Sequence, residues 1–218
     1  MITVASAVSQ VVSRSDFAIE GLQTGCLNLT AYADLIRAEI ETLTKKSVQK
    51  GSIVVALARL SAQYAGALPQ QTDFKLFNLV SRSGLTELTY TKTPALQKSV
   101  AALLERSDIQ TAPFCVATIG LGEISIVSHD ALAQSIQAAL VTHSPILNLP
   151  GLSSLTMQVG IETIDVPRQS YTVIKQLALR NITLVEYITS PTELTIILHD
   201  KDLKEAFVIL HDKFFSAR

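Results

Sequence analysis

The sequence predicts an α+β protein in which an all-helical N-terminal segment precedes two copies of one strand–helix–strand–strand–helix unit. Three observations lead to this prediction: apolar residues recur at helical spacing through residues 1–66, runs rich in β-formers follow, and one of these runs recurs later. Residues 66–73 contain Gly, Pro and Gln without apolar periodicity and mark the boundary. We therefore expect a helical domain at 1–70 and α+β units at 74–150 and 151–218.

Four helices are expected in the N-terminal segment. The first covers residues 2–12, the second ends at Gly25, the third begins at Asn28 or Thr30, and the fourth covers residues 50–65. Each carries an apolar stripe on one face, so the helices are expected to pack together around a small core.

The third and fourth of these helices have the shape of a helix-turn-helix, with Lys45, Lys46 and Lys50 near their junction as candidate nucleic-acid contacts. Residues 1–72 carry six Lys and Arg against five Asp and Glu, however, whereas DNA-binding domains are usually far more basic. A helical bundle that serves dimerisation or docking is the alternative.

The remaining elements follow from period-2 runs, turn residues and helical stripes. A hairpin is expected from residues 75–81 and 85–91 around the turn 82–84, and "SPILNLPG" (144–151) is expected to connect the two units. The other expected elements are helices at 94–106, 130–142, 167–180 and from 200 onward, and strands at 112–119, 123–129, 154–161, 182–189 and 193–199.

An internal repeat supports two copies of one unit. "EISIVSHD" (123–130) and "ELTIILHD" (193–200) are identical at four of eight positions, and each run precedes a helix. The order of elements predicts tandem ferredoxin-like β-α-β-β-α units. The His-Asp pair that ends both runs lacks further metal ligands nearby in sequence, so we expect each Asp to cap the following helix and no metal to bind.

The C-terminal part resembles the ACT domain, and more narrowly the C-terminal ACT unit of aspartate kinases. The residues that carry this resemblance are Val166-Pro167, Leu177-Ala178, Asn181-Ile182, the run Thr189–Leu194, and Leu210-His211 followed by Phe214. The preceding unit matches only in the order of its elements. Two departures stand out: Arg168 replaces the family's Gly after Pro, and nothing resembles the phosphate-binding loop that opens the kinase domain.

The resemblance implies an amino-acid site between paired ACT units. Mapped onto this sequence, the site comprises Asp165, Arg168, Gln169, Ser170, Asn181 and Ile182. Asp165 would accept the ligand's ammonium group, and the N-terminus of the helix that opens at Pro167 would donate to its carboxylate. The alternative is structural: Asp165 and Ser170 are turn and capping residues, and Asn181 is a left-handed helix cap.

Composition narrows the class of protein further. Hydrophobic residues make up 48% of the chain, the net charge is -1, and no apolar run is long enough for a membrane span. The two cysteines, Cys26 and Cys115, lie far apart and are expected to be packing residues in a reduced, cytoplasmic protein. The sequence shows no secretory signal, nucleotide-binding glycine motif or catalytic constellation, so we expect neither a cofactor nor an enzyme.

These observations predict a non-catalytic regulatory or sensory protein. Its ACT pair would bind an amino acid or mediate association, most simply as a homodimer. One alternative is an amino-acid-responsive DNA-binding regulator that uses the N-terminal helices. The other is a regulatory subunit of a separate amino-acid-biosynthetic enzyme such as aspartate kinase.

Overall fold

The computed structural model describes residues 2–65, 76–161 and 169–215. The chain divides into two compact units, a helical unit at Met1–Asp73 and an α+β unit at Phe74–Arg218. None of the described helices combines the length and hydropathy needed to cross a membrane.

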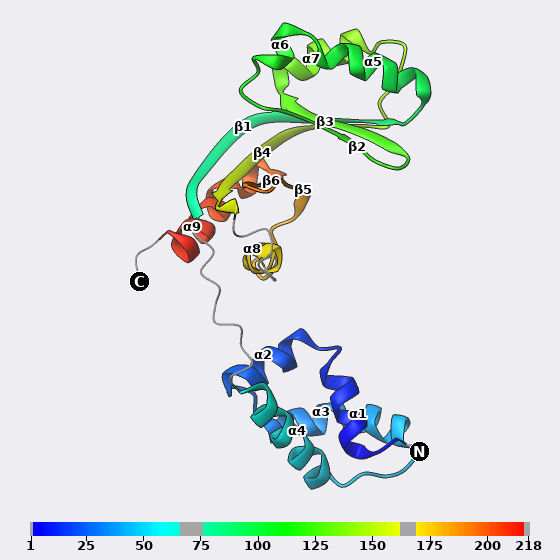
Figure 1. Cartoon of the computed structure of the whole chain (residues 1–218), viewed down its shortest axis with the longest axis vertical. Coiled ribbons are helices and arrows are strands. Elements are labelled where there is room, and N and C mark those ends of the chain that lie inside the picture. Colours follow the sequence, from blue (N-terminus) through cyan, green and yellow to red (C-terminus); the bar gives the residue numbers. More distant parts are fainter. Residues whose placement is uncertain (1, 66–75, 162–168, 216–218) are drawn as a thin grey trace. The chain divides into compact units, whose positions relative to one another are not determined.

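The helical unit consists of α1 (Val4–Val12), α2 (Asp16–Thr24), α3 (Leu29–Thr44) and α4 (Lys50–Tyr64) (Figure 1). The Asn28 side chain caps α3 by accepting hydrogen bonds from the backbone of Thr30 and Ala31, and Gly25 ends α2 in the left-handed region. Residues from all four helices form one apolar core, which includes Val8, Leu22, Ile40 and Leu57.

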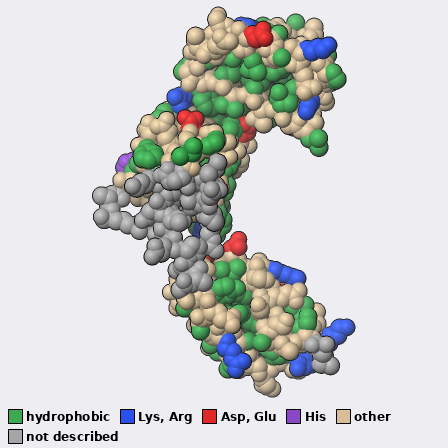
Figure 2. Space-filling model, viewed as in Figure 1, with side chains coloured by type: hydrophobic (Ala, Val, Ile, Leu, Met, Phe, Trp, Pro, Cys, Tyr) green, Lys and Arg blue, Asp and Glu red, His purple; other side chains and the backbone are tan. Residues whose placement is uncertain are grey.

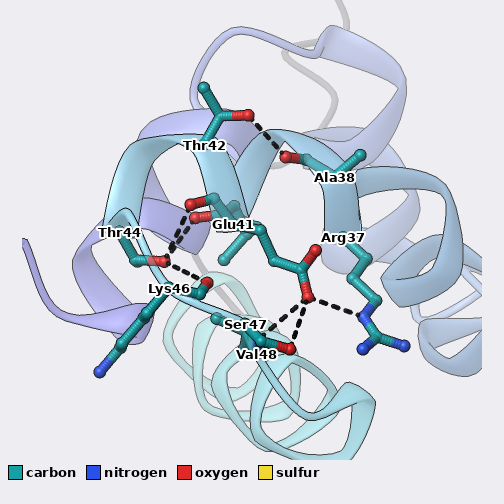
Figure 3. A network of polar contacts seen from close by, with 9 residues as sticks. Arg37, Ala38, Glu41, Thr42, Thr44, Lys46, Ser47 and Val48 are labelled. Atoms are coloured by element: carbon teal, nitrogen blue, oxygen red, sulfur yellow. Dashed lines mark hydrogen bonds and ion pairs between the residues drawn. The ribbon is translucent and has the colours of Figure 1, made fainter.

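The Glu41 side chain fastens the connection between α3 and α4 (Figure 3). Its Oε1 accepts hydrogen bonds from the Val48 backbone at 3.0 Å and from Arg37 Nε at 3.1 Å. These two contacts, the backbone contact foremost, hold the pKa of the Glu41 carboxyl below its usual range.

A carboxyl whose pKa is lowered by folding stabilises the folded state above its unfolded pKa. That stability is lost as the pH falls through the folded pKa. We expect Glu41→Gln to lower the melting temperature at neutral pH and to flatten its fall between about pH 5 and pH 2. Glu39→Gln, an exposed change on the same helix, should leave the shape of the acid melting curve unchanged.

The α+β unit contains one six-stranded antiparallel sheet in the order β2-β3-β1-β4-β6-β5. Its strands are β1 (Leu76–Thr91), β2 (Cys115–Ile119), β3 (Glu123–His129), β4 (Leu147–Val159), β5 (Leu184–Thr189) and β6 (Glu193–His199). Its helices are α5 (Pro94–Leu104), α6 (Ser107–Gln110), α7 (Asp130–Ala139), α8 (Gln169–Ala178) and α9 (Leu203–Phe214), with a short 3-10 turn at Asp200–Asp202 before α9.

The two central strands, β1 and β4, are shared by two ACT-like halves. The first half combines β2, β3 and the end of β1 with the start of β4, under α5, α6 and α7 (Figure 1). The second combines β5, β6 and the end of β4 with the start of β1, and its core includes residues of α8 and α9. Each half therefore has the four-strand order of a ferredoxin-like unit. The expected division at residues 150 and 151 falls inside β4.

Two sequence predictions about these strands are wrong. Residues 76–91 form one continuous strand instead of a hairpin, and the expected connection at 144–151 contains the start of β4. Gly84 and Gly151 have φ angles of 69° and 74°, and the β1–β4 register shifts between Arg82 and Leu85. The glycines that suggested turns thus lie where the central strand pair is irregular, and the strands continue through them.

The two His-Asp pairs have a structural role that differs from the expected helix cap. The N-cap positions are His129 and His199, and neither makes a side-chain capping bond. Instead, Asp130 accepts a hydrogen bond from Thr86 at 2.6 Å, and Asp200 accepts one from Ser153. Each bond ties the start of a helical segment to the adjoining central strand.

Ser153→Ala removes one of these ties from a fully buried side chain. We expect it to lower the free energy of unfolding by about 1 kcal/mol, because Asp200 is exposed and recovers a hydrogen bond from water. Ser83→Ala, an exposed change on β1, should have no measurable effect in the same denaturant titration. Equal stability of the two variants would show that the Ser153–Asp200 bond contributes nothing.

Candidate ligand-binding site

The sheet face opposite the helices carries a core of its own. Leu85, Val127, Leu152 and Ile197 are buried there, and Phe114 packs against them. Ser125 on β3 hydrogen-bonds to Glu186 on β5 although three strands separate β3 from β5 in the sheet. The sheet is therefore curled, and its helix-free face is the inner face of the curl.

A pocket of about 380 Å³ opens on this inner face. It is lined by residues of the strands of both halves and by the segment that leads into β2: Val80, Arg82, Ala112, Pro113, Phe114, Cys115, Val116, Thr156, Gln158, Ile188, Ser190, Glu193 and Thr195. The volume is within the range of small-molecule sites, which are mostly apolar with a few convergent polar groups.

Arg82 and Glu193 are the charged residues of this lining. The Arg82 guanidinium lies 5.9 Å from the centre of the Phe114 ring, in a cation–π contact that leaves its N–H groups free to donate elsewhere. Glu193 is exposed at the start of β6, opposite Gln158. The Thr156 and Thr195 hydroxyl oxygens lie 3.0 Å apart on neighbouring strands. A cation, an anion and two hydroxyls thus border one pocket whose lining is both polar and apolar.

A second polar group on the inner face is a pair of carboxyl side chains, Glu87 and Glu186. Glu87 Oε1 accepts hydrogen bonds from Thr89 and Ser125, both at 2.9 Å, and Ser125 also lies 2.7 Å from Glu186 Oε1. Burial raises the pKa of Glu186; the Ser125 hydrogen bond opposes this shift and the Glu87 charge adds to it. The Ser125 hydroxyl thus lies within hydrogen-bonding distance of both carboxyl groups, and its single hydrogen donates to one carboxyl oxygen at a time.

Of the site residues expected from the ACT resemblance, Asp165 and Arg168 lie outside the described residues. Gln169 and Ser170 begin α8, and the Ser170 hydroxyl opposes the rise that burial causes in the pKa of Tyr187. Asn181 is exposed in the left-handed region with φ of 56°, and Ile182 is buried in the core of the second half. The described members of this set therefore have the geometry of helix-end and core residues.

The lysines proposed for nucleic-acid contact also have structural positions. Lys45 ends α3 in the left-handed region, Lys46 is exposed, and Lys50 forms an ion pair with Asp34. The Lys and Arg side chains visible on the helical unit in Figure 2 lie apart from one another. This face carries no continuous basic stripe.

The cysteines and histidines add no further site. Cys26 is exposed, contrary to the expectation that it packs in the core, whereas Cys115 is half-buried and burial raises the pKa of its thiol. Among the described residues, no three His, Cys, Asp or Glu side chains gather as a metal site would require.

Sequence reasoning missed the residues of the inner face because they come from distant segments. Arg82, Thr156 and Thr195 meet through the pairing of β1, β4 and β6, and Phe114 joins them from the segment that leads into β2. One signal was available: "GLTELT" (84–89) recurs as "GLSSLT" (151–156), which marks β1 and β4 as equivalent strands.

No family model matches the chain, and no curated protein matches it in sequence. Solved structures do match in fold. The regulatory subunit of aspartate kinase from Thermus flavus is 13% identical, with 64% of this chain and 99% of that subunit covered at a TM-score of 0.53. Aspartate kinase from Clostridium acetobutylicum is 12% identical, with 64% of this chain and 35% of the enzyme covered at a TM-score of 0.52.

A third structure is E. coli aspartokinase III in complex with lysine and aspartate. It is 16% identical, with 80% of this chain and 44% of the enzyme covered at a TM-score of 0.50. The chain thus spans less than half the length of either full enzyme and almost the whole length of the Thermus flavus subunit. At these identities the similarity establishes the fold. The chain contains a tandem ACT-like fold similar to the regulatory parts of aspartate kinases, as the sequence indicated.

Proposed function

We propose that this protein is a non-catalytic regulatory protein whose α+β unit binds a small ligand, most simply a free amino acid. The observation that carries the proposal is the pocket of about 380 Å³ on the inner face, where Arg82, two hydroxyls and Glu193 lie beside apolar side chains. A free amino acid requires a donor for its carboxylate, an acceptor for its ammonium and a place for its side chain. The likeness to regulatory parts of aspartate kinases supports the same role.

A thermal-shift screen of the full chain against the twenty amino acids tests this proposal. A ligand that binds only the folded protein, present at about 100 times its dissociation constant, adds about 2.7 kcal/mol to the free energy of unfolding. In a protein of this size, that corresponds to a rise of several degrees in melting temperature. No shift with any of the twenty would contradict amino-acid binding and leave association as the role of the α+β unit.

A regulatory subunit of a separate enzyme is the second candidate. The specific observation in its favour is that a free-standing regulatory subunit, that of Thermus flavus aspartate kinase, is covered almost completely by this chain. Co-purification of an amino-acid kinase with the tagged protein from its native cell would support this role, and recovery of the protein by itself would oppose it.

The helical unit would then serve as output or docking domain in a cytoplasmic protein, with homodimerisation through ACT-like halves as the simplest assembly. DNA binding through Lys45 and Lys46 is the remaining alternative. It requires a mobility shift of duplex DNA that weakens steeply with salt. A sedimentation measurement of the full chain distinguishes monomer from dimer.

A further inference from the structure

The internal repeat gives the two halves of the inner face matching positions. Thr89 on β1 lies opposite Ser125 on β3, and Thr156 on β4 lies opposite Thr195 on β6. The same register makes Glu87 equivalent to Ser154, because Glu87 lies opposite Val127 and Ser154 lies opposite Ile197. It also makes Glu186 equivalent to Val116, because Glu186 on β5 lies opposite Ile197 and Val116 on β2 lies opposite Val127. Each polar group of one half therefore has a defined counterpart in the other.

In the first half, the hydroxyl pair holds carboxyl groups of the chain itself. Thr89 and Ser125 both hydrogen-bond to Oε1 of Glu87, a side chain that is only 6% exposed. Ser125 also hydrogen-bonds to Glu186, which reaches this place from β5 of the second half. Two hydroxyls that face each other on adjacent strands, Thr89 and Ser125, thus bind a carboxyl group in this protein.

In the second half, the structure describes no carboxyl side chain bonded to the corresponding hydroxyl pair, Thr156 and Thr195. Ser154 and Val116 stand at the positions of the two glutamates, and Val116 lines the pocket together with Thr156 and Thr195. Within the described residues, the Thr156 and Thr195 hydroxyls bond only to each other. Ser154 is fully buried on the same strand face as Thr156, and its Oγ has no hydrogen-bond partner in the described part of the chain. A buried hydroxyl without a partner is costly.

Arg82 makes the surroundings of this hydroxyl pair electrostatically different from those of its counterpart in the first half. Its guanidinium lines the pocket with Thr156 and Thr195, and none of the ion pairs among described residues involves it. An arginine beside hydroxyl donors is the usual arrangement for a carboxylate, because the guanidinium provides charge and paired N–H donors.

We infer that the pocket binds a small ligand through its carboxylate, which occupies the place that Glu87 and Glu186 fill in the other half. Thr156 and Thr195 donate to the carboxylate, and Arg82 neutralises it. Val80, Val116 and Ile188 surround the ligand's apolar body, and Glu193 accepts an ammonium group where the ligand has one. The inference rests on the proposed function and specifies the site and the recognised group. The ligand class is a small monocarboxylate with an apolar body, which includes the short aliphatic amino acids.

A first test lets the chain itself supply the carboxylate. Val116→Glu places a glutamate at the position equivalent to Glu186, and its effect is compared in the wild type and in Arg82→Gln. We expect the melting temperature to fall further in the Arg82→Gln background, by an additional ~2–4 °C, because the new carboxylate then lacks its cation. Equal losses in both backgrounds would contradict the inference.

A second test uses external probes and applies even where Val116→Glu prevents folding. L-valine has both charges, isovalerate has only the carboxylate, and isobutylamine has only the ammonium. We expect L-valine and isovalerate to raise the melting temperature of the wild type and isobutylamine to leave it unchanged. Arg82→Gln and Thr195→Val should each remove the shift, whereas Arg59→Gln, an exposed change in the helical unit, should retain it.

The outcomes separate this inference from the proposed function. If neither carboxylate probe shifts the wild type, or if both shift Arg82→Gln and Thr195→Val as they shift the wild type, the inference is wrong. The proposed function survives the first result if another of the twenty amino acids binds, and it survives the second because L-valine itself binds; the start of α8 then becomes the place to examine. It fails only if none of the twenty binds.

Discussion

Leu152→Ala is expected to lower the free energy of unfolding of the α+β unit by about 2–5 kcal/mol. Leu152 is fully buried and packs with Leu85, Val127 and Ile197 on the inner face, where both halves contribute residues. The loss combines the hydrophobic transfer of the removed methyl groups with the cavity that remains, since β1 and β4 hold the surrounding backbone in place. Chemical denaturation followed by circular dichroism measures it.

Leu147→Ala provides the matched control, because Leu147 lies on the same strand and is 42% exposed. We expect this variant to lose well under half as much stability as Leu152→Ala. Similar losses for the two leucines would mean that the inner face is not a joint core of the two halves.

Glu186→Gln is expected to stabilise the α+β unit at neutral pH by about 1–3 kcal/mol, with the lower end favoured by the partial exposure of Glu186. The pKa of this carboxyl is raised by burial, so folding favours its protonated form. The stability that the proton provides is complete below the unfolded pKa and is lost as the pH rises through the folded pKa. Glutamine is neutral at every pH, and its side-chain amide can donate hydrogen bonds to Ser125 and Glu87.

The measurement is the melting temperature of wild type and variant from about pH 4 to pH 8. The wild type should lose stability over the lower part of this range, and the curve of Glu186→Gln should be flatter there. Glu105→Gln, an exposed change at the end of α5, should follow the wild-type curve. A variant that is less stable than the wild type at pH 8 would show that Glu186 is bound as a carboxylate.

Local patterns in the sequence are sufficient to predict the longer helices and the strands β2, β3, β5 and β6, whereas the short helix α6 was not predicted. The apolar stripes of α3 and α4, the cap at Asn28 and the runs of β-formers in β3 and β6 are each read within one short window. The recurrence of "EISIVSHD" as "ELTIILHD" indicates two related units, and the structure contains two.

The central strands were mispredicted because a glycine in a sequence rich in β-formers marks either a turn or an irregular position within a strand. "RSG" and "LPG" are turn signals locally, yet Gly84 and Gly151 both lie within long strands. The long-range pairing of β1 with β4 carries each strand past its glycine, and a short sequence window does not contain that pairing.

The candidate site was still less accessible from sequence. Arg82 and Thr195 are separated by more than half of the chain, and the pairing of β1, β4 and β6 brings both to one pocket. The ACT resemblance directed attention to the start of α8 instead, where the described residues serve as helix ends and core.

Amide chemical shifts of the ¹⁵N-labelled full chain, recorded with and without L-valine, test whether the inner-face pocket is the binding site. We expect shift changes at Arg82, Val116, Thr156 and Thr195 that saturate together, with little change at Gln169 and Asn181. Saturable changes confined to Gln169, Ser170 and Asn181 would contradict this expectation and place the ligand at the start of α8.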